Sequence, residues 1–322
     1  MPTRRSRVRP PLPAPKIIVI KSEFITNLFQ NFLRDKDIRI FKKSLLYYLI
    51  FRIIRNFLSR NIIINIYNFK IHGSIKKNNT SYFLLKKCEF GDYHEINTLK
   101  RFSKYNKIFF IDCGCNYGFY SFHVASISQE NFVLALEAST ITSEFFLKNN
   151  EINNYKNLSF NNKAISDEDD KEVVFNESEN DWESSLTHNN FSSSKSKIVK
   201  TCKIDTLVKD YNLKEYILFI KLDIEGNEIK AIRGGTKIIE KFSPIIIIEF
   251  SKFIFDNQDN INFLNNFLVN FNYRIYDTNK NEINLSEIIV KINKLTKRHK
   301  TIGNYYLIKK NSKEFKLFKM ND

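Results

Sequence analysis

This sequence has few cysteines and no long uninterrupted apolar run. Cys88, Cys113, Cys115 and Cys202 are too few and too irregularly spaced for a disulfide framework, which favours a reducing compartment. No apolar stretch approaches the roughly 20 residues that span a bilayer. The apolar run 17–20 that follows the basic N-terminus is too short for a signal peptide. We therefore expect a cytoplasmic protein.

Several functional motifs are also missing. No Gly-Lys-Ser/Thr follows a glycine-rich turn, which excludes a P-loop, and the chain has no internal repeat. It lacks the Asn/Asp-Pro-Pro-aromatic motif of enzymes that methylate base amines, and it lacks a Pro-Cys nucleophile for carbon methylation. Cys113 and Cys115 form a C-x-C pair without the second pair that a zinc site needs, so we interpret them as small loop fillers.

The charge is concentrated at one end of the chain. The 322 residues contain 51 Lys/Arg and 35 Asp/Glu, a net charge of +16. Residues 1–110 contain 23 basic and 6 acidic side chains, a net of +17, and residues 111–322 contain 28 and 29, a net of −1. The basic excess therefore belongs entirely to the N-terminal third, and the rest has the balanced charge of a globular domain.

The composition divides the chain into three segments. Residues 1–16 are rich in arginine and proline, cannot form a core and are expected to be disordered. Residues 17–105 are expected to form basic amphipathic helices, over about 24–33 and 45–58, and accessory strands between 61 and 87. Residues 106–322 form the third segment, the expected catalytic domain.

The third segment alternates between strand and helix patterns. Apolar runs predict strands at KIFFID, FVLALE, LSFNNKAIS, YILFIKLDIE, IIIIEF, YRIYD and NYYLIKK, with helical patterns between most of them. Such alternation is typical of right-handed crossovers between parallel strands. The sequence therefore predicts an α/β fold with a doubly wound, mostly parallel, seven-stranded sheet.

The turn after the first of these strands predicts the ligand. In IDCGCNYGFYS, residues 111–121, Asp112 ends the strand, and Gly114, Asn116 and Gly118 follow it. A dinucleotide fold would show G-x-G-x-x-G, and an acid at this tip would repel a pyrophosphate. An acid at this position suits a ligand with an ammonium group, such as S-adenosylmethionine (SAM). Glu137 ends the next strand, where a carboxylate binds ribose hydroxyls in SAM and NAD folds alike.

Several motifs in order resemble one family. DCGCNYG (112–118) resembles the D-x-G-x-N-x-G loop of FkbM-family SAM-dependent methyltransferases, and KLDIEGNE (221–228) resembles their K-x-D-x-E-G-x-E segment. LEAS departs from the usual F-E-P but retains the acid. Four further segments match in order: NKAISD (162–167), SSL (184–186), IDTL (204–207) and PIIIIE (244–249).

The resemblance covers roughly residues 106–251 and implies a Rossmann-like class I methyltransferase fold with SAM as cofactor. It implies O-methylation, often of sugar or polyketide hydroxyls in natural-product or polysaccharide assembly. The acceptor would then be the hydroxyl of a glycan or small molecule. The cofactor-binding residues expected at the matching positions are Asp112, Gly114, Asn116, Gly118, Glu137, Ala164 and Asp223.

The carboxylates after the fourth strand are the candidate catalytic residues. We expect Asp223, Glu225 and Glu228 to act on the acceptor, as a general base or through substrate contacts. With Glu249 they could instead hold a divalent cation, an alternative we do not favour. In a third alternative, Asp223 only orients SAM or substrate and Glu228 only caps a helix.

Histidines and a tryptophan near these motifs have simpler interpretations. His123 falls on the helix after the loop, where packing is its expected role. His188 is a weaker candidate base, and Trp182 either stacks on a sugar or anchors its loop.

Three other functions compete with this interpretation. The +17 arm suits a nucleic-acid (RNA) methyltransferase, although the missing base-methylation motifs oppose it. Apolar residues at helical spacing within the arm favour peripheral contact with an anionic membrane surface or packing on the catalytic domain. A non-catalytic scaffold is disfavoured by the intact acids, and a nicotinamide oxidoreductase by the glycine spacing.

Overall fold

A computed structural model describes residues 62–73, 92–177, 195–296 and 300–320. The expected tail 1–16 and the expected helices over 24–33 and 45–58 lie outside these ranges. SYFLLKK (81–87), the second of the expected accessory strands, also lies outside them, as do SSL, Trp182 and His188. Within the described residues, no helix is both long enough and apolar enough to cross a membrane.

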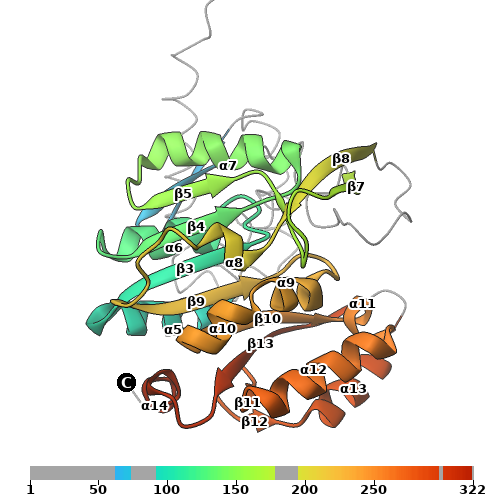
Figure 1. The fold of residues 1–322 in the computed structure, drawn as a ribbon. Coiled ribbons are helices and arrows are strands. Elements are labelled where there is room, and N and C mark those ends of the chain that lie inside the picture. The colour runs from blue at the N-terminus through green and yellow to red at the C-terminus, as the bar shows by residue number, and fades with distance from the viewer. Residues whose placement is uncertain (1–61, 74–91, 178–194, 297–299, 321–322) are drawn as a thin grey trace, which may run out of the picture.

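The described residues contain one large sheet of eight strands, in the order β12-β11-β13-β10-β9-β3-β4-β5 (Figure 1). The strands are β3 (Lys107–Cys113), β4 (Phe132–Leu136), β5 (Leu158–Asn161), β9 (Tyr216–Leu222), β10 (Ile245–Ser251), β11 (Tyr273–Tyr276), β12 (Glu282–Ile283) and β13 (Thr301–Lys309). Neighbours from β10 to β5 pair in parallel, and β13, β11 and β12 pair antiparallel. The predicted doubly wound, mostly parallel sheet is confirmed. The eighth strand, β12, has two residues and no apolar run that could predict it.

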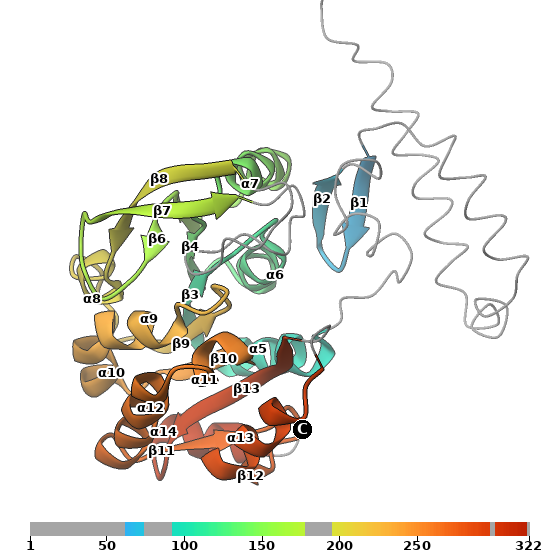
Figure 2. The same cartoon turned by 90° about the vertical axis from the view of Figure 1, so that its right-hand side faces the viewer.

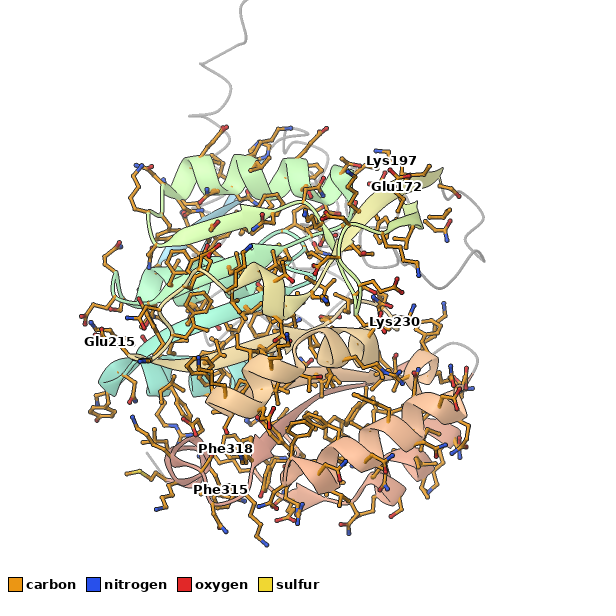
Figure 3. The ribbon with its side chains drawn as sticks, in the orientation of Figure 1. Glu172, Lys197, Glu215, Lys230, Phe315 and Phe318 are labelled. Carbon is orange, nitrogen blue, oxygen red and sulfur yellow. The ribbon has the colours of Figure 1, made fainter. Side chains whose placement is uncertain are left out.

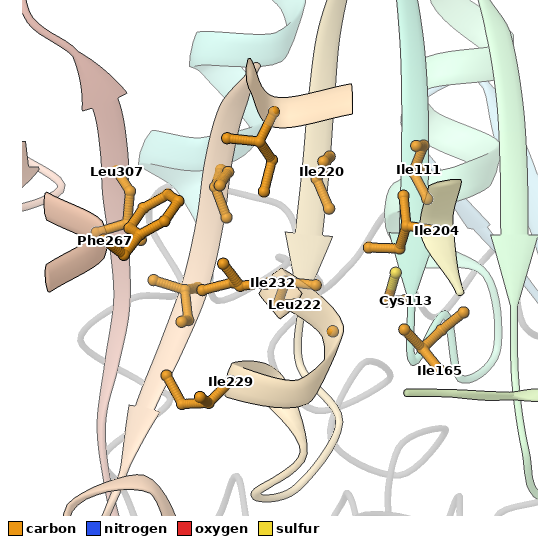
Figure 4. Close-up of a cluster of buried hydrophobic side chains, with 14 of the residues drawn as sticks. Ile111, Cys113, Ile165, Ile204, Ile220, Leu222, Ile229, Ile232, Phe267 and Leu307 are labelled. Atoms are coloured by element: carbon orange, nitrogen blue, oxygen red, sulfur yellow. The ribbon is translucent and has the colours of Figure 1, made fainter. Parts of the chain in front are cut away.

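Continuous apolar strands bury both faces of this sheet. Along β3, Ile108 and Phe110 point into one core, and Phe109 and Ile111 point into the other, because successive side chains of a strand alternate. Figure 4 shows the second core, in which Ile220 of β9 and Ile232 of the following helix pack on the sheet.

Helices cover the two faces as two layers (Figure 2). The first core is covered by α5 (Tyr93–Tyr105), α6 (Phe119–Ile127), α7 (Thr140–Asn153) and α14 (Lys313–Lys319). The second core is covered by α8 (Ile204–Leu207), α9 (Glu228–Gly234), α10 (Thr236–Phe242), α11 (Lys252–Phe255), α12 (Gln258–Asn270) and α13 (Leu285–Asn293).

Part of the N-terminal third belongs to the first core. The antiparallel hairpin β1 (Ile62–Ile66) and β2 (Phe69–Gly73) buries Phe69 and Ile71, and α5 buries Leu99. All three side chains pack in one cluster with the interior residues of β3 and α6. The predicted strand character of residues 62–73 is confirmed. The predicted boundary between residues 105 and 106 separates two elements of one core, α5 and β3.

A smaller sheet adjoins the carboxyl ends of β4 and β5. Its order is β6-β8-β7, with β6 (Ala164–Ile165), β7 (Glu172–Glu177) and β8 (Lys195–Cys202). Figure 3 shows Glu172 and Lys197 on this sheet, at the opposite end of the molecule from Phe315 and Phe318 of α14. No strand was predicted over β7 and β8, because their polar composition concealed the ladder between them. The predicted strand LSFNNKAIS is divided between β5 of the large sheet and β6 of this one.

The topology defines a switch point between β3 and β9. The chain runs from β3 outward through β4 to β5 and then returns to β9 on the other side of β3. Loops at the carboxyl ends of β3 and β9 therefore leave the sheet in opposite directions, and a ligand crevice forms between them. The segments that start at Gly114 and at Asp223 lie at this point.

Candidate functional site

The loop from Gly114 to Gly118 is held tightly against its neighbours. The N–H groups of Gly114 and Cys115 both donate to the carbonyl oxygen of Leu136 at 2.9 Å. Gly114 has a φ of +78°, and a Cβ placed on it would lie 2.0 Å from the backbone oxygen of Asp223. Only glycine allows the β3 and β9 loops to approach so closely.

Glu137 lies directly after β4 and bonds to this loop. Its Oε2 accepts from the N–H of Asn116 at 3.0 Å, and its Oε1 accepts from the N–H of Ser139 at 2.8 Å. Burial raises the pKa of Glu137 to about 7, despite these hydrogen bonds. The carboxylate is thereby fixed at the pocket edge with further lone pairs available.

One pocket contains most of the predicted site residues. It encloses about 700 Å³, part of it open to solvent. Its lining residues are Gly114, Asn116, Leu136, Glu137, Ala138, Thr142, Lys163, Ala164, Ile165, Phe175, Asp223, Ile224, Glu225 and Asn227. Six predicted residues, Gly114, Asn116, Glu137, Ala164, Asp223 and Glu225, thus line one cavity, whereas Asp112, Gly118 and Glu228 lie behind its wall.

Asp112 lies beneath the loop instead of facing the pocket. It is 1% exposed, and its Oδ2 accepts from the Ser121 hydroxyl of α6 at 2.6 Å. Strand alternation turns its side chain toward α6, on the same face as its register partner Lys221 of β9. Burial raises its pKa, although Lys221 and Ser121 act in the opposite direction. The position differs from the expected direct contact with a ligand ammonium.

Lys221 is a buried cation between two acids. Its Nζ lies 2.7 Å from Oδ2 of Asp223 and 4.8 Å from the ring centre of Tyr120. Burial alone would lower the pKa of Lys221, but Asp223 and Asp112 outweigh that effect and raise it. Lys221 therefore stays an ammonium ion that holds Asp223 at the end of β9.

Three carboxylates meet beside the pocket, and two of them, Asp223 and Glu225, line it. Ligand atoms of Asp223, Glu225 and Glu249 lie within 4.8 Å of one another. Burial, followed by the charge of Asp223, raises the pKa of Glu249 to about 8 and raises that of Glu225 well above its usual range. Neighbouring carboxylates disfavour one another's ionisation, so this cluster retains protons at neutral pH.

Glu228, the first residue of α9, supports the loop that presents these acids. Its Oε1 accepts from the N–H groups of Ile224 at 3.0 Å and Gly226 at 3.1 Å. It is 1% exposed, and burial raises its pKa to about 7. This geometry corresponds to the helix-terminal alternative for Glu228, and its catalytic role stays a prediction.

The family assignment follows from comparison with known proteins. A family model described as the methyltransferase FkbM domain matches residues 112–275, which is just over half of the 322 residues. The chain belongs to this family. The match starts at Asp112 of β3 and ends at Ile275 of β11, so it contains the whole pocket lining. A search of curated proteins finds no match.

Solved structures similar to this FkbM domain include an FkbM methyltransferase from Methylobacillus flagellatus, with 17% identity and a TM-score of 0.38. The alignment covers 70% of this chain and 52% of that one, so the chain spans about half the length of that protein. Another is a TYW2 protein from M. jannaschii in complex with AdoMet, with 11% identity, a TM-score of 0.37 and coverage of 78% and 84%. A third is a precorrin-6y C5,15-methyltransferase from Geobacter metallireducens, with 12% identity, a TM-score of 0.34 and coverage of 66% and 84%.

Several residues of the FkbM domain's pocket were missed by sequence reasoning. Lys163, Thr142, Phe175 and Asn227 line it, and Asn227 also donates to the carbonyl oxygen of Ile165. Asn227 stands inside the KLDIEGNE segment, so the motif itself was the available signal. Phe175 comes from β7, in the polar stretch where no pattern indicated a site.

Three other side chains discussed in the sequence analysis, His123, Cys113 and Cys115, are buried in the FkbM domain. His123 is buried on α6 beside the Tyr67 ring, at 5.2 Å between ring centres, and burial lowers its pKa to about 4. The packing interpretation of His123 is confirmed. Cys113 and Cys115 are buried free thiols whose pKa burial raises, as expected for loop fillers.

Proposed function

We propose that this FkbM domain transfers a methyl group from SAM to a hydroxyl of a sugar, glycan or similar metabolite. One observation carries the proposal: the pocket lining includes a fixed carboxylate, Glu137, and two members of a carboxylate cluster, Asp223 and Glu225. The fixed carboxylate suits a ribose, and the cluster suits a hydroxyl that must lose a proton. The distribution of acids therefore fits both a nucleoside donor and a neutral acceptor.

The residues present fit SAM better than a phosphorylated cofactor. Glu137, fixed by the Asn116 N–H, has lone pairs to which ribose hydroxyls can donate, and the Gly114–Gly118 loop provides a wall without a Cβ at Gly114. Lys163 is the only basic side chain among the described lining residues, and the charge of Asp223 opposes it, which disfavours a pyrophosphate. SAM, when bound, supplies an activated methyl group for in-line displacement.

The acceptor side depends on Asp223 and its neighbours. Lys221 holds one oxygen of Asp223 at 2.7 Å, which orients the carboxylate beside the pocket. A carboxylate so placed can accept a hydrogen bond and then a proton from an acceptor hydroxyl. Glu225 and Glu249 retain protons because of burial and mutual repulsion, so Glu225, which lines the pocket, can donate a hydrogen bond to an acceptor oxygen.

The RNA methyltransferase alternative is less well supported by this pocket. A polynucleotide brings phosphates close to the target base, and the charge of Asp223 would repel them. We therefore place RNA second to a neutral hydroxyl acceptor.

The test is a transfer assay with the full chain and isotope-labelled SAM, supplied separately with glycan, glycolipid and RNA extracts of the host. The proposal predicts label in a glycan or glycolipid product that gains about 14 daltons. The Glu137→Ala variant should lose the signal, and Glu144→Ala, an exposed glutamate on α7, should retain it. Label found only in RNA would overturn the acceptor assignment.

A further inference from the structure

The β1–β2 hairpin lies outside the segment matched by the family model, yet it packs against the elements that frame the loop. Phe69 and Ile71 are 3% and 0% exposed. Figure 2 shows the hairpin beside α6, and the Phe69 ring lies 6.2 Å from the Phe122 ring of α6. A Cβ on Gly118 would lie 2.3 Å from that Phe122 ring. The Phe122 side chain therefore lies between the hairpin and Gly118, the last residue of the loop.

Two asparagines of α7, one helical turn apart, bind the hairpin backbone. Asn153 accepts from the N–H of Lys70 at 2.8 Å and donates to the Lys70 carbonyl oxygen at 2.7 Å. Asn149 accepts from the N–H of His72 at 2.6 Å. A rise of about 6 Å over four helical residues matches about 6.8 Å over two strand residues, so both asparagines reach the same strand.

Asn149 also bonds to the loop. Its Nδ2 donates to the carbonyl oxygen of Tyr117 at 3.0 Å, and the side chain is 0% exposed. Tyr117 is the residue after Asn116, whose N–H donates to Glu137. One buried amide thus joins the hairpin backbone to the loop backbone, one residue from the bond that fixes Glu137.

We propose that the β1–β2 hairpin is a positioning element of the SAM site, and that Asn149 transmits its docking to the loop at Tyr117. This inference rests on the proposed SAM-dependent function. With the Tyr117 carbonyl held, the Asn116 N–H stays aimed at Glu137 and the pocket is preorganised. Without that bond the loop samples other conformations. The apparent affinity for SAM then falls in proportion to the fraction of molecules whose loop stays in the binding conformation.

Two matched variants of the full chain separate positioning from stability. Asn149→Asp retains the acceptor for His72 N–H, but it loses the donor to Tyr117 and places a charge against that carbonyl oxygen. Asn153→Asp removes a donor one turn away, from the carbonyl oxygens of Lys70 and Asn149, both at 2.7 Å, with no bond to the loop. Calorimetric titration with S-adenosylhomocysteine (SAH), the demethylated product, measures affinity, and thermal unfolding measures stability.

We expect both variants to unfold at lower temperature and only Asn149→Asp to lose SAH affinity, by about tenfold at about pH 8. Burial raises the pKa of a carboxyl group, and once protonated the new carboxyl can donate to Tyr117 again. The affinity of Asn149→Asp relative to wild type at the same pH should therefore recover toward about pH 5.5. Asn153→Asp places a carboxyl at the matching position without a bond to Tyr117, so its SAH affinity should stay at the wild-type value across the same pH range.

Three results decide the matter. Equal SAH affinity of Asn149→Asp and wild type at every pH would overturn the positioning role. Equal losses in Asn149→Asp and Asn153→Asp would overturn the route through Tyr117. A wild-type chain that does not bind SAH would overturn the proposed function, and this inference with it.

Discussion

Two glutamates of this site act on the backbone in the same way. Glu137 accepts from the N–H groups of Asn116 and Ser139, and Glu228 accepts from those of Ile224 and Gly226. Burial raises the pKa of each to about 7. Each loop at the switch point is thus fixed by a buried carboxylate, the β3 loop by Glu137 after β4 and the β9 loop by Glu228 of α9, which leaves Asp223 and Glu225 to face the pocket.

Asp223 is the residue whose substitution best separates chemistry from cofactor binding. If its carboxylate accepts the acceptor proton, Asp223→Asn should lower kcat by about a hundredfold or more and change SAM affinity by about threefold or less. Steady-state kinetics and calorimetry measure the two effects. Equal losses in both would move Asp223 to the cofactor side of the pocket.

The raised pKa of Glu249 predicts a pH-dependent stability. Between its ordinary pKa of 4.5 and its folded value of about 8, the folded protein holds a proton that the unfolded chain has released. The free energy of unfolding contributed by Glu249 is therefore greatest below about pH 4.5, falls through this window and levels off above about pH 8. Glu249→Gln should be more stable than wild type by about 1–3 kcal/mol at pH 8.5, a difference that vanishes toward pH 4.5.

Urea unfolding at several pH values measures this difference. Solvent reaches part of Glu249, so we expect only a part of the full shift as stability. Glu240→Gln, at an exposed position on α10, is the control and should show no such trend. A wild-type protein more stable than Glu249→Gln at pH 8.5 would contradict the buried, repelled carboxylate.

At the scale of elements, α5 belongs to the catalytic core. Leu99 is 0% exposed and packs in the cluster that contains the inner residues of β3. Leu99→Ala should therefore lower the free energy of unfolding by about 2–5 kcal/mol. Tyr105→Ala, at a 73% exposed position of the same helix, should change it by about 0.5 kcal/mol or less. If denaturant unfolding shows equally small losses of stability for Leu99→Ala and Tyr105→Ala, α5 does not belong to the core.

The buried elements could be predicted from sequence because their patterns are local. Apolar runs such as IIIIEF became β10, and the Gly114 turn and the acid at Glu137 reached the expected strand ends. The features that were not predicted correctly depend on contacts between residues distant in sequence. Whether Asp112 faces a ligand or α6 depends on strand alternation relative to β9, and the union of hairpin, α5 and sheet depends on contacts that no local pattern records.

The stretch that contains β7 and β8 also lacked a local pattern that could predict its strands. The ladder of β7 and β8 is half exposed, so its sequence lacks the continuous apolar signal of the central strands. Asp205, in the IDTL motif, accepts from the N–H groups of Lys237 and Ile238 and holds the start of α10. A match to a family motif therefore did not distinguish a residue that supports a helix from a residue that lines the pocket.

At the scale of the whole molecule, the charge distribution predicts a surface interaction. Residues 1–110 have a net charge of +17, whereas residues 111–322 have a net charge of −1. Attraction of about 1 kcal/mol per basic residue near anionic lipid should float the full chain with anionic vesicles. We expect about 0.5 M salt to release much of it and neutral vesicles to leave it behind. Protein that stays at the bottom of the gradient with anionic vesicles at low salt would contradict this prediction.

The central claim is that the pocket between β3, β4 and β9 binds a nucleoside cofactor without a pyrophosphate. The most direct measurement is calorimetric titration of the full chain with SAM, SAH and NADH under the same conditions. The account predicts binding of SAM and SAH at about micromolar Kd, weakened by about 1–3 kcal/mol in Glu137→Ala, and no binding of NADH. Binding of NADH without binding of SAM would contradict it.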